Sequence, residues 1–260
     1  MNSLKTYLFV LGCVCLAIFF SGCADKTKPI KEETTRESLR MDSSVTKATD
    51  QDTSSIKEIV PERFSNGTLL KAVSNNDLLL VKRILQDETY SIDEVNEKNE
   101  TSLLIATHQN LIEIAKALID AGANINQQDA ISDSPYLFAG AQGRTEILAY
   151  MLDKQVPDQQ KFNRFGGTAL IPAAEKGHLE NVKLLLRDGR VNLNHQNHSG
   201  YTALIEAVAL RDGSEVYQEI VKVLLENGAD KTLRDNTGRS AVDYARQFGY
   251  GNMIELLQSY

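Results

Sequence analysis

The sequence predicts an all-α solenoid of about six helix-turn-helix units, preceded by an export signal and a disordered tether. A short apolar block returns six times in residues 63–260, at offsets of 34, 33, 34, 34 and 38 residues. In the clearest unit, a glycine separates this block from a second pattern with helical spacing. Self-similarity at such a period is the signature of stacked supersecondary units.

The overall composition is that of an ordinary globular protein. The chain has 260 residues, of which 42% are hydrophobic and 24% charged, and its formal net charge is −7. These values exclude collagen-like, wholly disordered and multi-span membrane proteins. An acidic chain without a clustered excess of Lys and Arg is also not expected to bind nucleic acid.

Residues 1–22 form the predicted signal peptide. The apolar run from Tyr7 to Phe20 has 14 residues, fewer than the roughly 20 needed to span a bilayer. Ser21 and Gly22 precede Cys23 as in a bacterial lipobox, although Phe20 stands where an aliphatic residue is usual. A plain signal peptide and an uncleaved anchor are the alternatives.

The cysteines agree with a lipoprotein signal. Cys13 and Cys15 lie in the segment to be removed, and Cys23 would carry the lipid, including palmitate. The mature protein would then have no disulfide and would depend on its core for stability. We therefore expect a lipid-anchored, extracytoplasmic protein on the cell membrane or outer membrane, and Ala24 is not the Asp that favours inner-membrane retention in Gram-negative cells.

Residues 23–62 are predicted to be the lipidated cysteine and a disordered linker. After Cys23 this segment holds 7 basic and 9 acidic residues, 11 Ser or Thr, and no aromatic residue. Such a composition cannot bury enough apolar surface to offset the entropy lost on ordering. The linker would hold the folded domain away from the membrane, with an r.m.s. reach of about 30–40 Å.

The fourth unit shows why the repeat is read as helix-turn-helix. Thr168 is positioned to cap a helix that begins at Ala169, and Gly177 breaks the chain before a second helix. In that second helix, Val182 and Leu185 recur at helical spacing. Gly189 ends it, and a hairpin-like loop leads to the next unit. In the fifth unit, the extra residues 212–216 are expected to form a solvated loop.

At these residues the sequence resembles the ankyrin repeat family, most clearly in 166–189 and 121–126. The resemblance covers about 196 residues and gives a domain at 63–260, with units near 65–98, 99–131, 132–165, 166–199, 200–237 and 238–260. It implies a concave surface, made of first helices and hairpin tips, that binds another protein without a cofactor or intrinsic chemistry. The family's His in the opening block is absent throughout, and apolar residues such as Leu104 and Ile205 are expected to replace it by packing.

Histidine is the natural place to look for an enzymatic alternative. His178 occupies the family's structural Gly-His position, and His108 is expected to be solvated in a turn. His195 and His198 could supply two metal ligands, but a catalytic zinc needs three from the protein. The mature chain also lacks a Gly-x-Ser-x-Gly elbow, an exposed thiol and a phosphate-binding loop. A solute-binding lipoprotein would need two α/β lobes, for which no strand pattern exists. The protein is therefore predicted not to be an enzyme and to bind no metal.

The predicted protein-binding residues lie at the hairpin tips, which should project to one side of the stack. They are Lys98, Asp129, Phe162, Asn163, Arg164, Phe165, His195, His198, Tyr201, Arg234 and Asp235. Large aromatic residues and Arg dominate binding energy when an interface buries them. The alternative is that one or both Phe rings pack back over the irregular third unit.

Helix ends allow a prediction about stability. Second helices are expected to end at a left-handed glycine, but Gln155 and Glu88 stand at that position in units three and one. A non-glycine residue in this conformation costs about 1 kcal/mol, so these units should be the loosest. Gln155→Gly should then raise the melting temperature or leave it unchanged.

The function predicted from the sequence is that of a membrane-anchored, monomeric adaptor for a protein partner. An immunity protein that neutralises a secreted toxin is the alternative within the same class. No residue distinguishes a toxin from an envelope enzyme or a sister subunit as the partner.

Overall fold

The computed structural model describes residues 62–260. Most of the predicted signal peptide and linker, with Cys23, therefore lies outside the described residues. The repeat region belongs to a compact unit that comprises Lys57–Tyr260.

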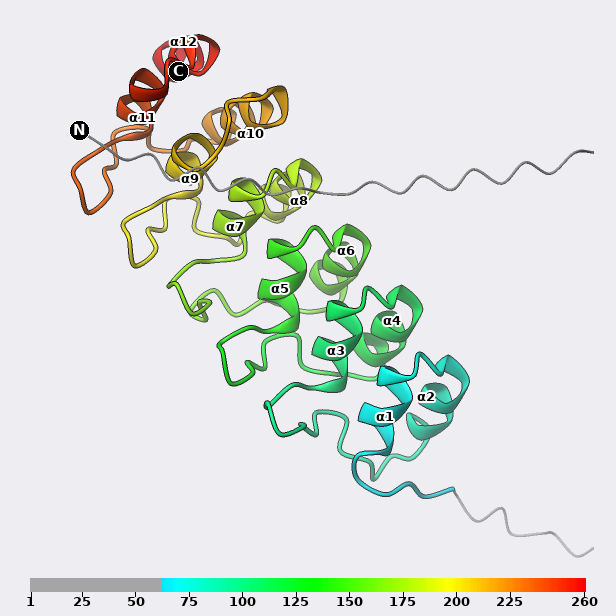
Figure 1. Cartoon of the computed structure of the whole chain (residues 1–260). Coiled ribbons are helices and arrows are strands. Elements are labelled where there is room, and N and C mark those ends of the chain that lie inside the picture. The colour runs from blue at the N-terminus through cyan, green and yellow to red at the C-terminus, as the bar shows by residue number, and fades with distance from the viewer. Residues whose placement is uncertain (1–61) are drawn as a thin grey trace, which may run out of the picture. The chain divides into compact units, whose positions relative to one another are not determined.

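The described residues form twelve helices arranged as six consecutive pairs, which confirms the all-α repeat fold (Figure 1). The pairs are α1 Thr68–Ser74 with α2 Leu78–Ile84, α3 Ser102–His108 with α4 Ile112–Asp120, α5 Pro135–Ala141 with α6 Thr145–Lys154, α7 Leu170–Glu175 with α8 Leu179–Asp188, α9 Ala203–Ala209 with α10 Glu215–Glu226, and α11 Ala241–Phe248 with α12 Gly251–Ser259.

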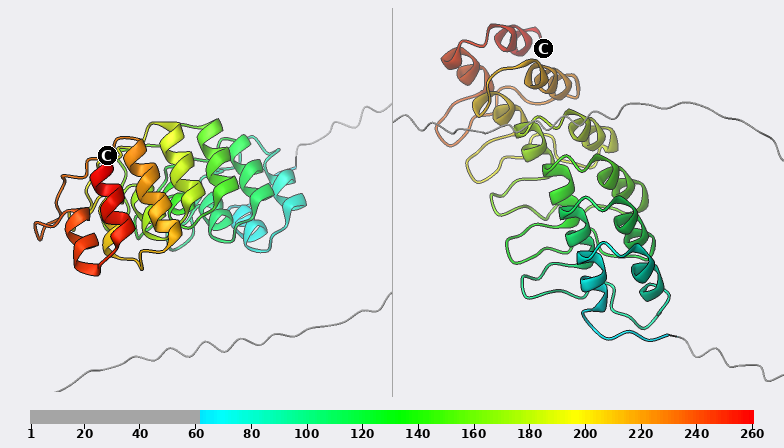
Figure 2. Two further views of the ribbon diagram at one scale, coloured as in Figure 1. Left: turned by 90° about the horizontal axis from the view of Figure 1, so that it is seen from above. Right: turned by 45° about the vertical axis from the view of Figure 1, so that its right-hand side comes forward.

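The pairs stack side by side, so that first helices form one row, second helices another, and the connecting loops project beyond the first row (Figures 1 and 2). Within residues 62–260, the only β-type pairing is an isolated bridge between Val95 and Thr101. No helix in that range is long and apolar enough to cross a bilayer.

Most first helices start at a capping hydroxyl group. The side chains of Thr101, Ser134 and Thr202 each accept a hydrogen bond from the backbone N–H three residues later. At α11, Ser240 and Asp243 form a capping box. Thr168 was predicted to cap α7, and this is wrong: the helix begins at Leu170, and the Thr168 hydroxyl is buried without a hydrogen-bond partner.

The second helices of units one to five end in three different ways. Gly122, Gly189 and Gly228 adopt the predicted left-handed conformation, with φ between 72° and 91°. Gln155 instead has extended backbone angles, φ −138° and ψ 165°, and its side-chain Nε2 donates to the Ala123 carbonyl at 2.8 Å. Glu88 lies beyond the end of α2, whose C-cap is Leu85 in a right-handed conformation. The premise that Gln155 and Glu88 are strained is therefore wrong.

The insertion in unit five lengthens a helix. Glu215 and Val216 are the first residues of α10, so only residues 212–214 of the insertion lie outside the helix. The expectation of a solvated loop over all five residues is wrong for this pair, although both side chains are exposed.

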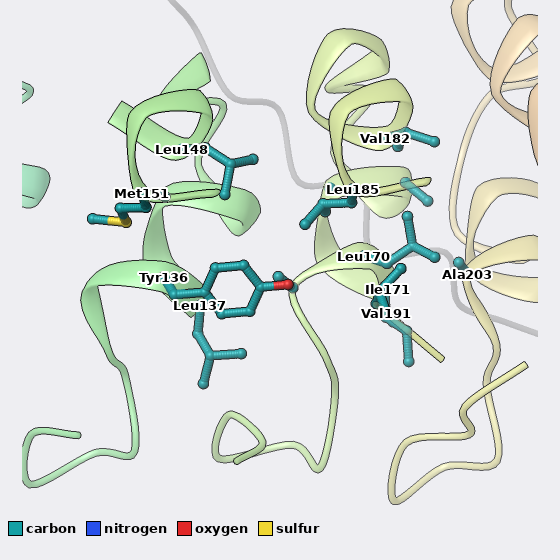
Figure 3. Packing of buried hydrophobic residues seen from close by; sticks show 14 of the residues in the cluster. Tyr136, Leu137, Leu148, Met151, Leu170, Ile171, Val182, Leu185, Val191 and Ala203 are labelled. Carbon is teal, nitrogen blue, oxygen red and sulfur yellow. The ribbon is translucent and has the colours of Figure 1, made fainter. Parts of the chain in front are cut away.

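One continuous core runs through the stack between the two rows of helices. Tyr136 extends from α5 toward the next unit, where Leu170 and Leu185 pack beside it (Figure 3). Of the apolar residues that replace the family's His, Leu104, Leu137, Ile171 and Ile205 are buried as expected, whereas Leu70 in the first unit is only partly buried. Each pair cannot bury its apolar side alone, so stacking is what stabilises the fold.

Candidate functional site

The loops that link successive units end in five tips with one shared geometry. Each tip starts with Asn or Asp, whose Oδ1 accepts hydrogen bonds from the backbone N–H groups two and four residues later. The fourth residue of each tip is left-handed. The tips are 96–100, 129–133, 163–167, 197–201 and 235–239. This Asx geometry fixes the loop without a sheet and sets which side chains face outward.

Three of the predicted binding residues use their side chains to stabilise the tips. Asp129, Asn163 and Asp235 are the first residues of their tips, so the Oδ1 atom of each accepts hydrogen bonds within its own loop. Asp235 is buried and also accepts from the Tyr244 hydroxyl at 2.5 Å. Burial raises the pKa of Asp235, but the hydrogen bonds from Tyr244, Thr237 and Arg239 outweigh burial and lower this pKa to about 2.

The two Phe residues of the third tip have different environments. Phe162, just before the tip, is half-buried and stacks on the His195 ring at a centroid distance of 4.4 Å. Phe165, the third residue of the tip, is 60% exposed, and the Arg164 guanidinium lies 5.0 Å from its ring centroid. The aromatic surface predicted here therefore consists of Phe165 and Arg164 rather than of two free rings.

A second exposed apolar residue occupies the same position in the tip before it. Ile131 is the third residue of tip 129–133 and is 53% exposed. Lys98, Ser199 and Thr237 occupy this position in the other tips. Successive units thus place Ile131 and Phe165 at equivalent places on one surface.

The remaining predicted residues are scattered around the fourth and fifth tips. His195 Nε2 lies 2.7 Å from the Gly166 carbonyl oxygen, and the His198 ring covers Gly166. Arg234 donates to the Gly238 carbonyl and to Asp243, at 2.7 and 2.8 Å. Tyr201 packs edge-on against Tyr244.

Two hollows lie on either side of Phe165 in the face formed by the first helices and the tips, which we call the tip face. The larger, about 280 Å³, is bounded by Phe165, Pro172, Tyr201, Glu206 and Leu210, among others. The smaller, about 120 Å³, lies between Phe165, Phe138 and Arg164. Asn163, Phe165, Pro172 and Glu175 line both.

A buried acid lies in the wall of the larger hollow. Glu206, in α9, is 7% exposed, and its Oε1 accepts a hydrogen bond from Asn197 at 2.8 Å. Burial raises the pKa of Glu206 to about 7, the Glu175 carboxylate adds to this rise, and Asn197 and Arg211 oppose it. Arg211 is itself paired with Glu175.

The histidines do not form a metal site within the described chain. No group of three or more His, Cys, Asp or Glu side chains with suitable spacing occurs in residues 62–260. His108 was expected to be solvated, which is wrong: it ends α3, is half-buried, and packs on the Phe138 ring at 4.1 Å. Burial accordingly lowers the pKa of His108.

Sequence reasoning missed three features of this surface, namely Ile131, Glu206 and the Asx geometry. The last has a signal in the sequence, because Asn or Asp recurs at 96, 129, 163, 197 and 235. An alignment of the units on this Asn or Asp would also have identified Ile131, two residues after Asp129. Glu206 has no such signal, since its burial depends on the neighbouring unit.

Comparison with known proteins identifies the repeat. The family model for ankyrin repeats (three copies) matches residues 69–162 and 137–235. The ankyrin repeat protein YahD of Escherichia coli (strain K12) is 39% identical over 166 residues, which cover 64% of this chain and 82% of YahD. A human 2-5A-dependent ribonuclease is 26% identical over 193 residues, but only 26% of its length is covered.

Solved structures agree with these relatives. The crystal structure of the ankyrin repeat protein EF0377 is 61% identical, with a TM-score of 0.75, and covers 76% of this chain and 100% of that one. An ankyrin repeat domain from Acinetobacter baumannii AYE is 46% identical, with a TM-score of 0.70, covering 74% of this chain and 96% of that domain. Ankyrin repeats are typical of protein–protein interaction modules rather than of enzymes, although the ribonuclease shows that an enzyme can contain them. With the matched model, the six stacked pairs and these relatives in agreement, the chain belongs to the ankyrin repeat family.

Proposed function

We propose that this protein is a membrane-anchored, extracytoplasmic, monomeric interaction module that binds one protein partner through its tip face. The observation that carries the proposal is the exposed pair Ile131 and Phe165, at equivalent positions of successive tips and beside Arg164. An exposed apolar patch with a neighbouring Arg is typical of binding surfaces.

The hollows beside Phe165 also favour the tip face as the binding surface. Binding energy concentrates where a side chain of one protein fills a pocket of the other. The second-helix side is less suited to this role. Its exposed apolar side chains Leu79 and Val156 line neither of these hollows, and the hollow between α10 and α12 is lined mainly by polar residues.

The binding proposal is tested by capture of the partner from the native envelope. Arg164→Ala combined with Phe165→Ala should weaken capture by about 2 kcal/mol or more, with little change in melting temperature. Leu79→Ala, which removes an even more exposed apolar side chain from α2, is the control and should bind as the wild type does. Equal binding by all three proteins would overturn the assignment of this face, and recovery of no partner would overturn the function.

The location is proposed from the sequence of residues 1–23. The wild-type protein should incorporate labelled palmitate, and Cys23→Ala should block both incorporation and processing. A durable anchor requires two or more acyl chains, which lipidation at this cysteine would supply. Absence of label in the wild type would overturn the anchor while leaving the binding proposal intact.

A further inference from the structure

The carboxyl group of Glu206 has one oxygen that the fold does not use. Oε1 accepts from Asn197, but no hydrogen bond to Oε2 occurs among residues 62–260. Oε2 is also not among the fully buried polar atoms that lack a partner, so it can be reached from the hollow that Glu206 lines. The carboxylate of a residue that is only 7% exposed is costly to keep charged unless an opposite charge lies beside it.

The nearby Arg211 does not neutralise the charge of Glu206. Arg211 follows α9 and forms its ion pair with Glu175, on α7. These two side chains neutralise each other, so an ionised Glu206 leaves the hollow with one uncompensated negative charge. Asn197 and Tyr201, which face the hollow from the fourth tip, are neutral.

The walls of the hollow are suited to a long aliphatic stem. Phe165 and Leu210, 60% and 45% exposed, line it together with the buried Ile171 and Pro172. Lysine and arginine bury their methylene groups along such surfaces while the charged end seeks a polar partner. The Phe165 and Tyr201 rings can also attract a cation.

We propose that this hollow receives a lysine or arginine side chain of the partner, whose charge pairs with Glu206. This inference rests on the proposed function and adds the chemistry of the partner: it presents a cationic side chain at the centre of the contact. The acidic charge of the chain favours the same kind of partner, because complementary charge speeds association.

The test uses the repeat region alone, residues 57–260. This region forms a compact unit, and EF0377, whose whole crystallised chain aligns with the repeats, folds without any other domain. The probes are blocked single amino acids: N-acetyl-arginine methylamide, N-acetyl-lysine methylamide and, as a neutral analogue, N-acetyl-norleucine methylamide. Binding is followed by NMR titration at pH 8, where Glu206 is ionised.

We expect the two cationic probes to shift the signals of Phe165, Tyr201 and Glu206 with millimolar affinity. The norleucine probe should bind at least about tenfold more weakly, a difference of about 1.4 kcal/mol. Glu206→Gln should abolish the preference for cations, whereas Glu146→Gln, which changes an exposed carboxylate on α6, should preserve it. Phe165→Ala should weaken both cationic probes.

Three results would overturn the inference: no binding of the cationic probes, equal binding of norleucine, or an unchanged cation preference in Glu206→Gln. The proposed function is judged separately by partner capture. If Arg164→Ala with Phe165→Ala disrupts capture but Glu206→Gln does not, the tip face binds the partner without a cation in this hollow. If no partner is captured while the probes bind as expected, the hollow is still a binding site for a cationic side chain, but the proposed function is overturned.

Discussion

The His195 imidazole lies nearly parallel to the Phe162 ring, with an angle of 11° between the planes and 4.4 Å between the centroids. A hydrogen bond between His195 Nε2 and the Gly166 carbonyl holds the imidazole in place. Phe162 is thereby tied to the following unit and contributes to stacking. Phe165, only three residues later, has no such contact with His195.

The two Phe residues should therefore differ in their effect on stability. Phe162→Ala is expected to lower the free energy of unfolding by about 1–2 kcal/mol, because it removes a stacked, half-buried ring. Phe165→Ala should change it by no more than about 0.5 kcal/mol. Urea unfolding of both variants of residues 57–260 checks this, and equal losses would show that the two rings share one environment.

Gln155→Gly is now expected to reduce stability. The substitution removes the hydrogen bond from Nε2 to the Ala123 carbonyl. It also increases the conformational entropy of the unfolded chain, while the extended backbone at this position does not require glycine. Together these effects amount to about 1–2 kcal/mol. Gln155→Ala separates them, since it removes the same hydrogen bond but not the Cβ. A rise in melting temperature for Gln155→Gly would restore the idea of a strained helix end.

Asn110 offers a cleaner test of left-handed strain. It links α3 and α4 with φ 56°, at the place where the third and fourth units have Gly143 and Gly177. Asparagine tolerates this conformation better than alanine does, and glycine adopts it freely. Asn110→Ala should thus be less stable than Asn110→Gly by about 1 kcal/mol in thermal unfolding. Equal stability of the two variants would show that the turn relaxes.

Glu206 should make stability depend on pH. Its pKa in the folded protein, about 7, is above its ordinary value near 4.5, so the folded state holds the proton more tightly than the unfolded state does. The free energy of unfolding should then fall as the pH rises from about 4.5 to 7, and stay low above pH 7. The difference between wild type and Glu206→Gln should change by on the order of 3 kcal/mol across this window.

The measurement is a series of urea unfolding curves from pH 4.5 to 8 for the wild type, Glu206→Gln and Glu146→Gln. The curve for Glu146→Gln should run parallel to that of the wild type, because its side chain is exposed. Parallel curves for all three proteins would mean that Glu206 is solvated in the folded state.

The sequence was sufficient to predict the repeat, because spacing and apolar pattern are properties of one unit repeated six times. It was insufficient where a neighbouring unit decides the outcome. Gln155 avoids a left-handed conformation by bonding to Ala123 of the preceding unit, and Glu206 is buried against residues of units four and five. Phe162 and Phe165 are chemically identical, and only their positions relative to Asn163 separate the packed ring from the exposed one.

The tips are also joined to one another, with one exception. Backbone hydrogen bonds run from Ala130 to Lys98, from His198 to Phe165 and from Asn236 to Ser199. Within residues 62–260, the equivalent bond from Arg164 to Ile131 is missing, and only side chains join these two tips: Gln128 donates to the Phe162 carbonyl, and Arg164 pairs with Asp133. A side-chain amide is a softer link than a backbone bond, so this junction should be the most compliant hinge along the tips. Because Ile131 and Phe165 stand on its two sides, a small bend there would widen or narrow the distance between these two side chains, so the contact with the partner would tolerate small changes in their spacing.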